Sequence, residues 1–464
     1  VHEFFVNGQP ATRARHPNTG YLRVEKVGAD RRTGFTFRAD DLPVGDYAGA
    51  ELLFLHDWSS SRVSIAAVDH ATRQLTTRHP VGPSAAHYAM DNFEKQPRYA
   101  ISGAGFLLDS PGEWQQDGAT LTYAPREGDI AGEARAVIPQ ARQLILARNA
   151  ANIRFQGITF AHTAWPLPER GHAGRQASWF EDRADDAIQR LQPIASALDF
   201  ADSERCELRN CELRNLGGGG VIFGKGCLGN RVLNCELRSI GANGIGVGSE
   251  SDAKAASSTV IDGCLIEDCG RRFLGAVGIW IGIASDTRIT HCELRNLPYT
   301  GISLGWRWWS PGARPHPVPS AARGSYIAYN HIHHVLQSLS DGGGIYTLGV
   351  QPGTVIRRNH IHHIPVNLGR AQSNGMFFDQ GSGQLLVEEN LLHDIERSPF
   401  RFHKGWFCEL RNNWVVLSPQ MKMVTYNDTK ESRITLQNNA SIAKDSPEFA
   451  RFIQFFLPQG KKKK

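Results

Sequence analysis

Two residues that could exchange a proton stand at matching places in the second half of the chain. Asp379 and His403 each come four residues after the glycine or proline that opens a short segment, in Gly375-Met-Phe-Phe-Asp and Pro399-Phe-Arg-Phe-His. If these segments pair as neighbouring strands, the two side chains lie about 5 Å apart. A carboxylate beside an imidazole can transfer protons. The alternative interpretation is a surface ion pair.

A second carboxylate, Asp341, comes directly before the glycine run 342–344. An acidic residue in this position usually marks a turn, but glycine also permits a bulge that would direct Asp341 toward Asp379. Counted along extended strands, the two aspartates are seven positions apart, about 23 Å. A bulge or turn is therefore needed to bring them within the roughly 5–9.5 Å that paired carboxyl groups need for glycoside hydrolysis.

An internal repeat must position these residues. From about residue 200 a short unit recurs every 23 to 39 residues, and each unit is a few alternating residues bounded by Gly, Asn or Pro. This pattern is typical of short strands and not of helices. The units begin at Asn210, Asn234, Gly263, His291, Asn330, Asn359, Asn390, Asn413 and Asn438.

A second column of units runs in phase with the first. Its members begin at Gly220, Gly244, Gly278, Gly301, Gly344, Gly375 and Pro399. Two short strands per repeat, joined by turns of irregular length, indicate an all-β chain that forms a right-handed parallel β-helix. We expect the recurring asparagines to stack as an amide ladder at a turn, with about 4.8 Å between coils.

Strand parity divides the second column into a core face and an outer face. The positions one and three residues after the opening residue are apolar in most units, so we predict that they fill the core. The alternating positions would form an outer strip that contains Trp280, Tyr346, Phe377, Asp379, Arg401 and His403. Aromatic faces, carboxylates and arginine suit the rings and hydroxyls of a sugar polymer.

Histidines and cysteines also recur in columns. The histidines are His331, His333, His334, His360, His362, His363 and His393. No acidic residue repeats with them, so we expect stacked histidines that face solvent at a turn, and no metal site. Cys211, Cys235, Cys264 and Cys292 share one column and are expected to be small apolar fillers, because a disulfide scaffold or zinc site has little support in this pattern.

The domain organisation follows from where the repeat begins. Residues 1–150 lack the repeat and have strand-like alternation, so we predict a β-rich accessory domain that is appended to the helix or interrupts it. Residues 151–460 are predicted to form the β-helix, with a long turn insertion at about 164–195 and another insertion at about 306–325. A lysine tail follows at 461–464.

Composition argues against some partners. Lys and Arg total 51 and Asp and Glu total 46, and four of those positive charges belong to the lysine tail, so the rest of the chain carries 51 − 4 − 46 = +1. This balance argues against nucleic-acid or membrane-surface binding. We expect no signal peptide in the sequence that opens at Val1, with an earlier removal of a secretion signal left open, and the sequence contains no long apolar run. Because it starts at Val1, we expect a processed or trimmed product.

Four motifs stand in a fixed order along the second half: Ala276-Val-Gly-Ile-Trp-Ile-Gly, Leu297-Pro-Tyr-Thr-Gly-Ile-Ser-Leu-Gly-Trp, Asp341-Gly-Gly-Gly-Ile-Tyr-Thr-Leu-Gly and Phe378-Asp-Gln-Gly-Ser. With Phe155-Gln-Gly-Ile-Thr-Phe and Pro111-Gly-Glu-Trp, they resemble the bacterial β-helix enzymes of glycoside hydrolase family 141. The resemblance implies a right-handed β-helix with an interrupting β domain, α-L-fucosidase or xylanase activity on plant cell-wall glycans, and a secreted or periplasmic location. It also implies a catalytic pair at Asp341 and Asp379.

The chain departs from this family in two places. The usual Asp-Glu-Gly-Ser reads Asp379-Gln-Gly-Ser here, and Gln380 cannot act as an acid or a base. Members usually carry further coils before the segment that begins here at His2, so we expect a truncated or unusually short chain.

We therefore expect a glycoside hydrolase in which Asp341 and Asp379 serve as the two carboxylates, in an order left open, and His403 orients Asp379. The expected sugar-binding residues are Trp280, Tyr299, Trp306, Tyr346, Phe377, Gln380, Arg401 and Lys404. The substrate would be an oligo- or polysaccharide. We expect no cofactor, with a structural calcium ion kept open.

Two alternatives remain at this stage. A polysaccharide lyase of the same fold would use Arg401 or Lys404 as its base, with Ca²⁺ bound by acidic residues. The second alternative is a non-catalytic β-helix protein that binds a glycan or another protein, because a fold does not determine a function.

Overall fold

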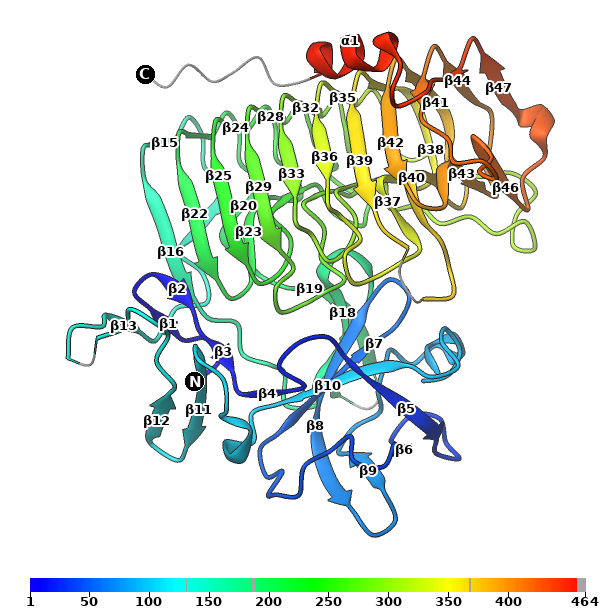
Figure 1. The fold of residues 1–464 in the computed structure, drawn as a ribbon. Coiled ribbons are helices and arrows are strands. Elements are labelled where there is room, and N and C mark those ends of the chain that lie inside the picture. Colours follow the sequence, from blue (N-terminus) through cyan, green and yellow to red (C-terminus); the bar gives the residue numbers. More distant parts are fainter. Residues whose placement is uncertain (131, 186–187, 367–368, 457–464) are drawn as a thin grey trace.

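The chain is a right-handed parallel β-helix with an extra N-terminal β domain (Figure 1). This computed structural model describes residues 1–130, 132–185, 188–366 and 369–456, so the predicted lysine tail lies outside the described residues. The strands of the β-helix form three ten-stranded parallel sheets, and each coil of the β-helix contributes one strand to each sheet. Both the fold class and the additional β domain were predicted correctly.

The first sheet, called sheet 1 below, carries the predicted outer strip. Its strands, in spatial order, are β14 (Ile145–Arg148), β20 (Ser196–Ala201), β23 (Gly219–Phe223), β26 (Ile245–Val247), β30 (Ile279–Ile281), β34 (Ile302–Leu304), β37 (Gly342–Thr347), β40 (Ser373–Phe378), β43 (Ser398–His403) and β46 (Val424–Asn427).

Sheets 2 and 3 complete each coil. Sheet 2 consists of β15 (Arg154–Gln156), β21 (Glu207–Arg209), β24 (Arg231–Leu233), β28 (Val260–Asp262), β32 (Arg288–Thr290), β35 (Tyr326–Ala328), β38 (Val350–Arg357), β41 (Gly383–Glu388), β44 (Cys408–Arg411) and β47 (Ile434–Gln437). Sheet 3 consists of β16 (Thr159–Thr163), β22 (Glu212–Leu216), β25 (Glu236–Ile240), β29 (Leu265–Cys269), β33 (Glu293–Arg295), β36 (His331–His333), β39 (His360–Ile364), β42 (Leu391–Ile395), β45 (Trp414–Val415) and β48 (Ala440–Ser441). The short strands β27 (Ala256–Ser257) and β31 (Ala284–Ser285) pair beside them.

The register of sheet 1 is the one that strand parity predicts. Ile279 pairs with Ile302, Ile302 with Ile345, Ile345 with Met376, and Met376 with Phe400. All five side chains are buried in the main hydrophobic core. Because parallel strands keep like positions side by side, the core of the helix is a stack of such columns.

The asparagine ladder is real but is displaced from part of its predicted column. Asn330, Asn359, Asn390 and Asn413 each donate from Nδ2 to the next asparagine, and the last acceptor is Asn439. In the earlier coils the same column holds Cys211, Cys235, Cys264 and Cys292, which are buried and form no disulfide. The backbone N–H of Cys292 donates to Asn330 Oδ1 at 3.0 Å.

Asn210, Asn234 and Asn438, which were predicted to belong to the ladder, lie one position earlier in their coils. They adopt left-handed backbone angles, with φ of 51°, 52° and 52°. Asparagine tolerates this conformation at turns better than most residues. The displaced asparagines therefore shape the turn instead of joining the ladder.

The histidines also differ from their predicted place. His331 and His333 lie on β36, His360 and His362 on β39, and His393 on β42, so these side chains belong to strands and not to a turn. His360 and His393 are buried, which corrects the expectation that the column faces solvent.

The N-terminal domain is built mainly of antiparallel strands and lies against one side of the helix (Figure 1). Its strands are β1 (Phe5–Val6), β2 (Gln9–Pro10), β3 (Thr12–Arg13), β4 (Arg15–His16), β5 (Leu22–Val27), β6 (Gly34–Phe37), β7 (Glu51–Leu55), β8 (Ser60–Asp69), β9 (Gln74–Thr77), β10 (Arg98–Ser102), β11 (Glu113–Asp117), β12 (Thr120–Tyr123) and β13 (Ala136–Val137).

The segment predicted as a long turn at 164–195 contains strands. β17 (His172–Gly174) pairs with β8, β18 (Trp179–Asp185) pairs with β17, and β19 (Ile188–Pro193) pairs with β18, so the segment extends the sheet of the N-terminal domain. Trp179 and Phe180 are buried there. The segment leaves the helix between β16 and β20 and ties the two parts of the molecule together.

A single α-helix, α1 (Pro447–Phe456), follows the last strand of the described chain. It lies beside sheet 3, where the Phe449 ring contacts His393 and the Phe452 ring contacts Trp414. No helix in the described ranges is long and apolar enough to span a lipid bilayer.

The ladder gives a first prediction. Asn359→Ala removes a buried amide that donates to Ile327 O and Asn390 Oδ1 and that accepts from Asn330. Several buried polar groups would lose their partners, so we expect the free energy of unfolding to fall by about 1–3 kcal/mol, measured by urea denaturation. The exposed Gln437→Ala is the control. Equal urea midpoints for the two variants would contradict a stabilising ladder.

Candidate active site

Asp341 and Asp379 line one cavity of about 530 Å³ between sheet 1 and the N-terminal domain. Asp379 directly follows β40, and Asp341 directly precedes β37. Asp341 has a left-handed φ of 55°, whereas the pairing of β37 with β40 keeps one constant register from Gly342 to Thr347, so the chain turns at Asp341 itself and the glycine run forms no bulge. With this turn the Asp341 side chain lines the cavity.

Only glycine fits at position 342, because neighbouring atoms leave no room for a side chain. A Cβ at this position would lie 2.4 Å from Thr300 Oγ1 and 2.8 Å from the Tyr299 ring. Such contacts are too close for any side chain, and a shift would displace the neighbouring Asp341.

Asp379 is held by two hydrogen bonds. Tyr346 Oη donates to Asp379 Oδ2 at 2.6 Å, and His403 Nδ1 lies 2.7 Å from Asp379 Oδ1. Burial and the Asp379 charge raise the pKa of Tyr346 well above its usual value, so the phenol keeps its proton. Asp379 and His403 thus form the pair that their matching strand positions predict.

Asp341 has a different environment. Burial raises its pKa to about 6, with the charges of Asp379 and Asp57 acting in the same direction and the Arg401 guanidinium opposing them. Arg401 Nη1 donates to Asp341 Oδ1 at 3.2 Å, and Arg401 Cζ lies 4.4 Å from the centre of the Phe377 ring. Arg401 therefore acts on Asp341 from behind the cavity and packs on Phe377, and neither side chain lines the cavity, which differs from the predicted contact of both with sugar.

Tyr299 supports the backbone of Asp341. Its hydroxyl donates to Asp341 O at 3.0 Å and accepts from Gln176 Nε2 at 2.8 Å. Tyr299 is fully buried, so its place is behind the site and not in contact with a sugar as expected.

The tryptophans divide into two roles. Trp306 and the 44% exposed Trp308 line the cavity. Trp280 packs between Trp179 and Trp306, with ring centroids 5.6 and 5.4 Å away, and is 1% exposed. The predicted outer strip is thus covered, because the N-terminal domain and its added strands lie over it.

Gln380 lines the cavity beside Asp379, whereas Lys404 does not. Lys404 adopts a left-handed φ of 55°, and its carbonyl accepts from Gly381 N at 3.1 Å. Its place is a turn after β43, so its predicted contact with substrate has no support in this geometry.

The N-terminal domain supplies a wall of the cavity that the repeat pattern gave no means of finding. The lining residues from this domain are Trp58, His87, Tyr88, Asn92 and Phe93. The segment 164–195 adds Arg175, Gln176 and Leu191, and the loop between β39 and β40 adds Arg370. Most lie in loops. The one sequence signal was aromatic residues within a stretch rich in turns at 80–93, and this signal carries no spacing that relates it to sheet 1.

Asp57 fastens this wall to the site. It is fully buried, its Oδ1 accepts from Arg370 N at 2.7 Å, and its backbone carbonyl accepts from Ser340 N at 2.7 Å. Ser340 is the residue before Asp341, so the N-terminal domain holds the turn that presents the second carboxylate.

The arrangement can perform acid and base chemistry. Two carboxylates face one cavity, and one has a raised pKa while the other accepts hydrogen bonds from a tyrosine and a histidine. Such contrasting surroundings are how proteins separate a proton donor from a charged carboxylate.

A family model described as a right-handed beta helix region matches residues 196–310. No curated protein sequence matches the chain. Among solved structures, one described as a glycoside hydrolase has 22% identity and a TM-score of 0.71, and the match covers 97% of this chain and 78% of that one. At this identity the likeness establishes a shared fold.

Weaker matches include other β-helix proteins. An alginate lyase from Paenibacillus sp. has 11% identity, covers 54% of this chain and 76% of its own, and gives a TM-score of 0.34. A mannuronan C-5 epimerase module from Azotobacter vinelandii has 10% identity and a TM-score of 0.37, and the match covers 54% of this chain and 70% of that one.

The raised pKa of Asp341 makes a prediction about stability. Since its pKa is higher in the folded than in the unfolded chain, the folded protein binds more protons between about pH 4 and 6, and the stability contribution of Asp341 falls as pH rises through that window. Asp341→Asn should therefore gain stability relative to the wild type from pH 4 to pH 7.5, by up to about 3 kcal/mol. Urea denaturation at both pH values measures the gain.

The control is Glu127→Gln, which changes an exposed carboxylate. Its stability difference from the wild type should vary little with pH. If Asp341→Asn shows the same flat dependence, the carboxyl group of Asp341 is not protonated preferentially in the folded protein.

Proposed function

We propose that the protein is a glycoside hydrolase in which Asp341 donates a proton to the leaving oxygen and Asp379 acts as the nucleophile or as the base toward water. The observation that carries the proposal is the pair of carboxylates in one cavity with contrasting surroundings. A general acid must hold its proton near the working pH, and the raised pKa of Asp341 meets this requirement.

Asp379 is suited to the charged role. The Tyr346 hydroxyl and the His403 ring nitrogen approach its two oxygens, and donated hydrogen bonds stabilise a carboxylate anion. His403 also fixes the direction in which Asp379 points. In this proposal Tyr346 and His403 are positioning residues, and the bond is broken between the two aspartates.

The walls of the cavity support a sugar substrate. Trp58, Tyr88, Phe93, Trp306 and Trp308 offer ring faces for stacking on sugar rings, while Arg175, Gln176, Gln380 and Arg370 offer polar groups for hydroxyls. The resemblance to glycoside hydrolase family 141 favours a plant cell-wall glycan, of the α-L-fucosylated or xylan type, and a secreted or periplasmic location. No organic cofactor takes part in the proposed reaction.

Substitution of the aspartates tests the proposal. Asp341→Asn and Asp379→Asn should each lower the rate of sugar release from defined plant glycans by at least about 100-fold, because each loses proton transfer or nucleophilic attack. Product analysis by chromatography measures the release. Asp262→Asn, on sheet 2 and remote from the cavity, should keep wild-type activity.

Other outcomes would favour the alternatives. Full activity of either aspartate variant would remove that residue from the mechanism. An unsaturated product that absorbs ultraviolet light would indicate a lyase, and glycan binding that survives both substitutions without turnover would indicate a binding protein.

The dependence of activity on pH gives a further test. If Asp341 is the acid, kcat should fall as pH rises above about 6. Arg401→Met removes the positive charge that holds the pKa of Asp341 down, so the descending limb of the profile should move to higher pH. Arg411→Met, on sheet 2, is the matched control. A limb unmoved in Arg401→Met would argue that Asp341 does not donate the proton.

A further inference from the structure

The outer face of sheet 3 carries a histidine cluster that the proposed hydrolase mechanism does not use. Its strands β36 and β39 alternate between isoleucines in the core and histidines that point outward. The cavity with the aspartates lies on sheet 1, so the cluster belongs to a separate face of the helix.

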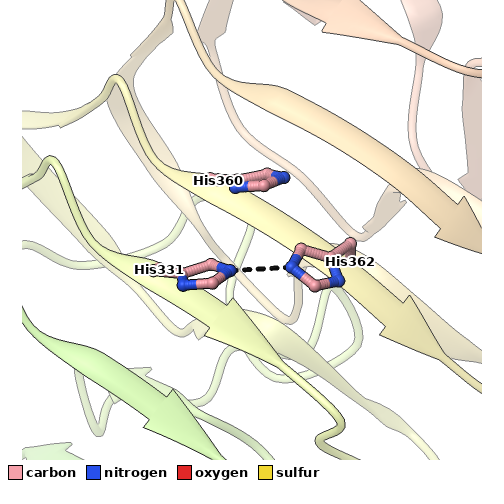
Figure 2. Close-up of side chains that lie close together, drawn as sticks. All are labelled: His331, His360 and His362. Atoms are coloured by element: carbon pink, nitrogen blue, oxygen red, sulfur yellow. Dashed lines mark hydrogen bonds between the residues drawn. The ribbon is translucent and has the colours of Figure 1, made fainter. Parts of the chain in front are cut away.

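The imidazoles of this cluster contact one another in a repeating pattern. The rings of His331 and His360 stack across neighbouring strands at 4.9 Å, with an angle of 9° between their planes. His331 Nε2 lies 2.7 Å from His362 Nε2 on the diagonal. Figure 2 shows the rings of His331 and His362 facing each other edge to edge, with His360 beside them. One ring nitrogen of each of these three histidines lies within 4.8 Å of the others.

These nitrogens are chemically suited to bind a metal ion. A neutral imidazole binds a metal ion through the ring nitrogen that carries a lone pair, and each of the three rings offers one nitrogen within 4.8 Å of the others. His360 is 3% exposed, and its Nδ1 is buried without a hydrogen-bond partner. The other ring nitrogen, Nε2, lies 2.8 Å from His393 Nε2, so Nδ1 is the nitrogen of His360 that is open to an ion, and burial without a partner makes such a contact favourable.

The surroundings supply outer contacts for such ligands. His362 Nδ1 contacts His363 Nδ1, so its other nitrogen is oriented toward His331. Glu293 occupies the same column as His331 one coil earlier, and its Oε1 lies 3.4 Å from His333 Nε2. Glu293 therefore supplies an acidic group at the edge of the cluster, although no acidic residue repeats with the histidines in the sequence.

We propose that His331, His360 and His362 bind one Zn²⁺ ion, with water completing the coordination. Three imidazoles from two adjacent strands match the ligand type that Zn²⁺ prefers, and small rotations of the rings would open the 2.7 Å separation to the roughly 3.3 Å expected between ligands of a tetrahedral ion with about 2.05 Å bonds. The bound ion would tie β36 to β39 and brace two adjacent coils within sheet 3.

Metal binding to the full chain tests the site. The protein, free of any affinity tag and stripped with EDTA, is titrated with ZnSO₄ by calorimetry, and bound zinc is counted by mass spectrometry after dialysis. We expect one equivalent in the wild type. His331→Gln and His362→Gln should each weaken binding by at least about 10-fold, while the exposed His316→Ala should bind as the wild type does.

Co²⁺ gives a spectroscopic readout on the wild-type protein. Bound by three imidazoles and water, it should show the intense visible absorption of tetrahedral Co²⁺, and Zn²⁺ should displace it and raise the thermal unfolding midpoint of the wild type but not of His331→Gln. Circular dichroism establishes that the variants are folded.

Three results would overturn the proposal. They are absence of stoichiometric zinc in the wild type, unchanged binding in both glutamine variants, or octahedral Co²⁺ spectra. Loss of binding in Glu293→Gln together with retention in His362→Gln would overturn the assignment in favour of Glu293, His331 and His333, the other group of nearby ligand atoms.

Discussion

The structure depends on the parallel register that places each residue beside its counterpart in the next coil. Hydrogen bonds between parallel strands hold neighbouring coils about 4.8 Å apart, so any residue type that recurs at one position becomes a continuous column. The asparagine ladder, the cysteine column and the histidine cluster are three results of this constraint. The contact between Asp379 and His403 is a fourth, because each residue ends or follows its strand on adjacent coils.

The register alone does not complete the candidate active site. Asp341 enters the cavity because the chain turns through a left-handed residue beside glycines, and this turn is held by Tyr299 from the helix and by Asp57 from the N-terminal domain. The N-terminal domain therefore has a local function at the site as well as covering sheet 1. A parallel β-helix without it would present Asp379 on an open face, with no second wall to exclude water from the carboxylates.

The sequence predicts the features that the register of the coils determines, but not those that depend on contacts with the N-terminal domain. Repeats and strand parity predict the columns, so the core positions and the Asp379 and His403 pair followed from local patterns. They did not reveal that Trp280 and Tyr299 are covered, because the covering residues are distant in the chain. The asparagine column was misplaced by one position in the early coils, where cysteine fills the ladder and asparagine adopts the adjacent left-handed turn. Local sequence does not separate these two uses of asparagine.

Both proposed sites follow from the same physical situation. A residue that points outward from a parallel sheet is normally hydrated, but here the N-terminal domain covers part of sheet 1 and α1 lies beside the histidines of sheet 3. Partial removal of water disfavours the charged form of each group, so the carboxyl of Asp341 tends to keep its proton while the imidazoles tend to lose theirs. Covering of an outer face thus favours the protonated carboxyl group beside sheet 1 and the uncharged imidazole on sheet 3.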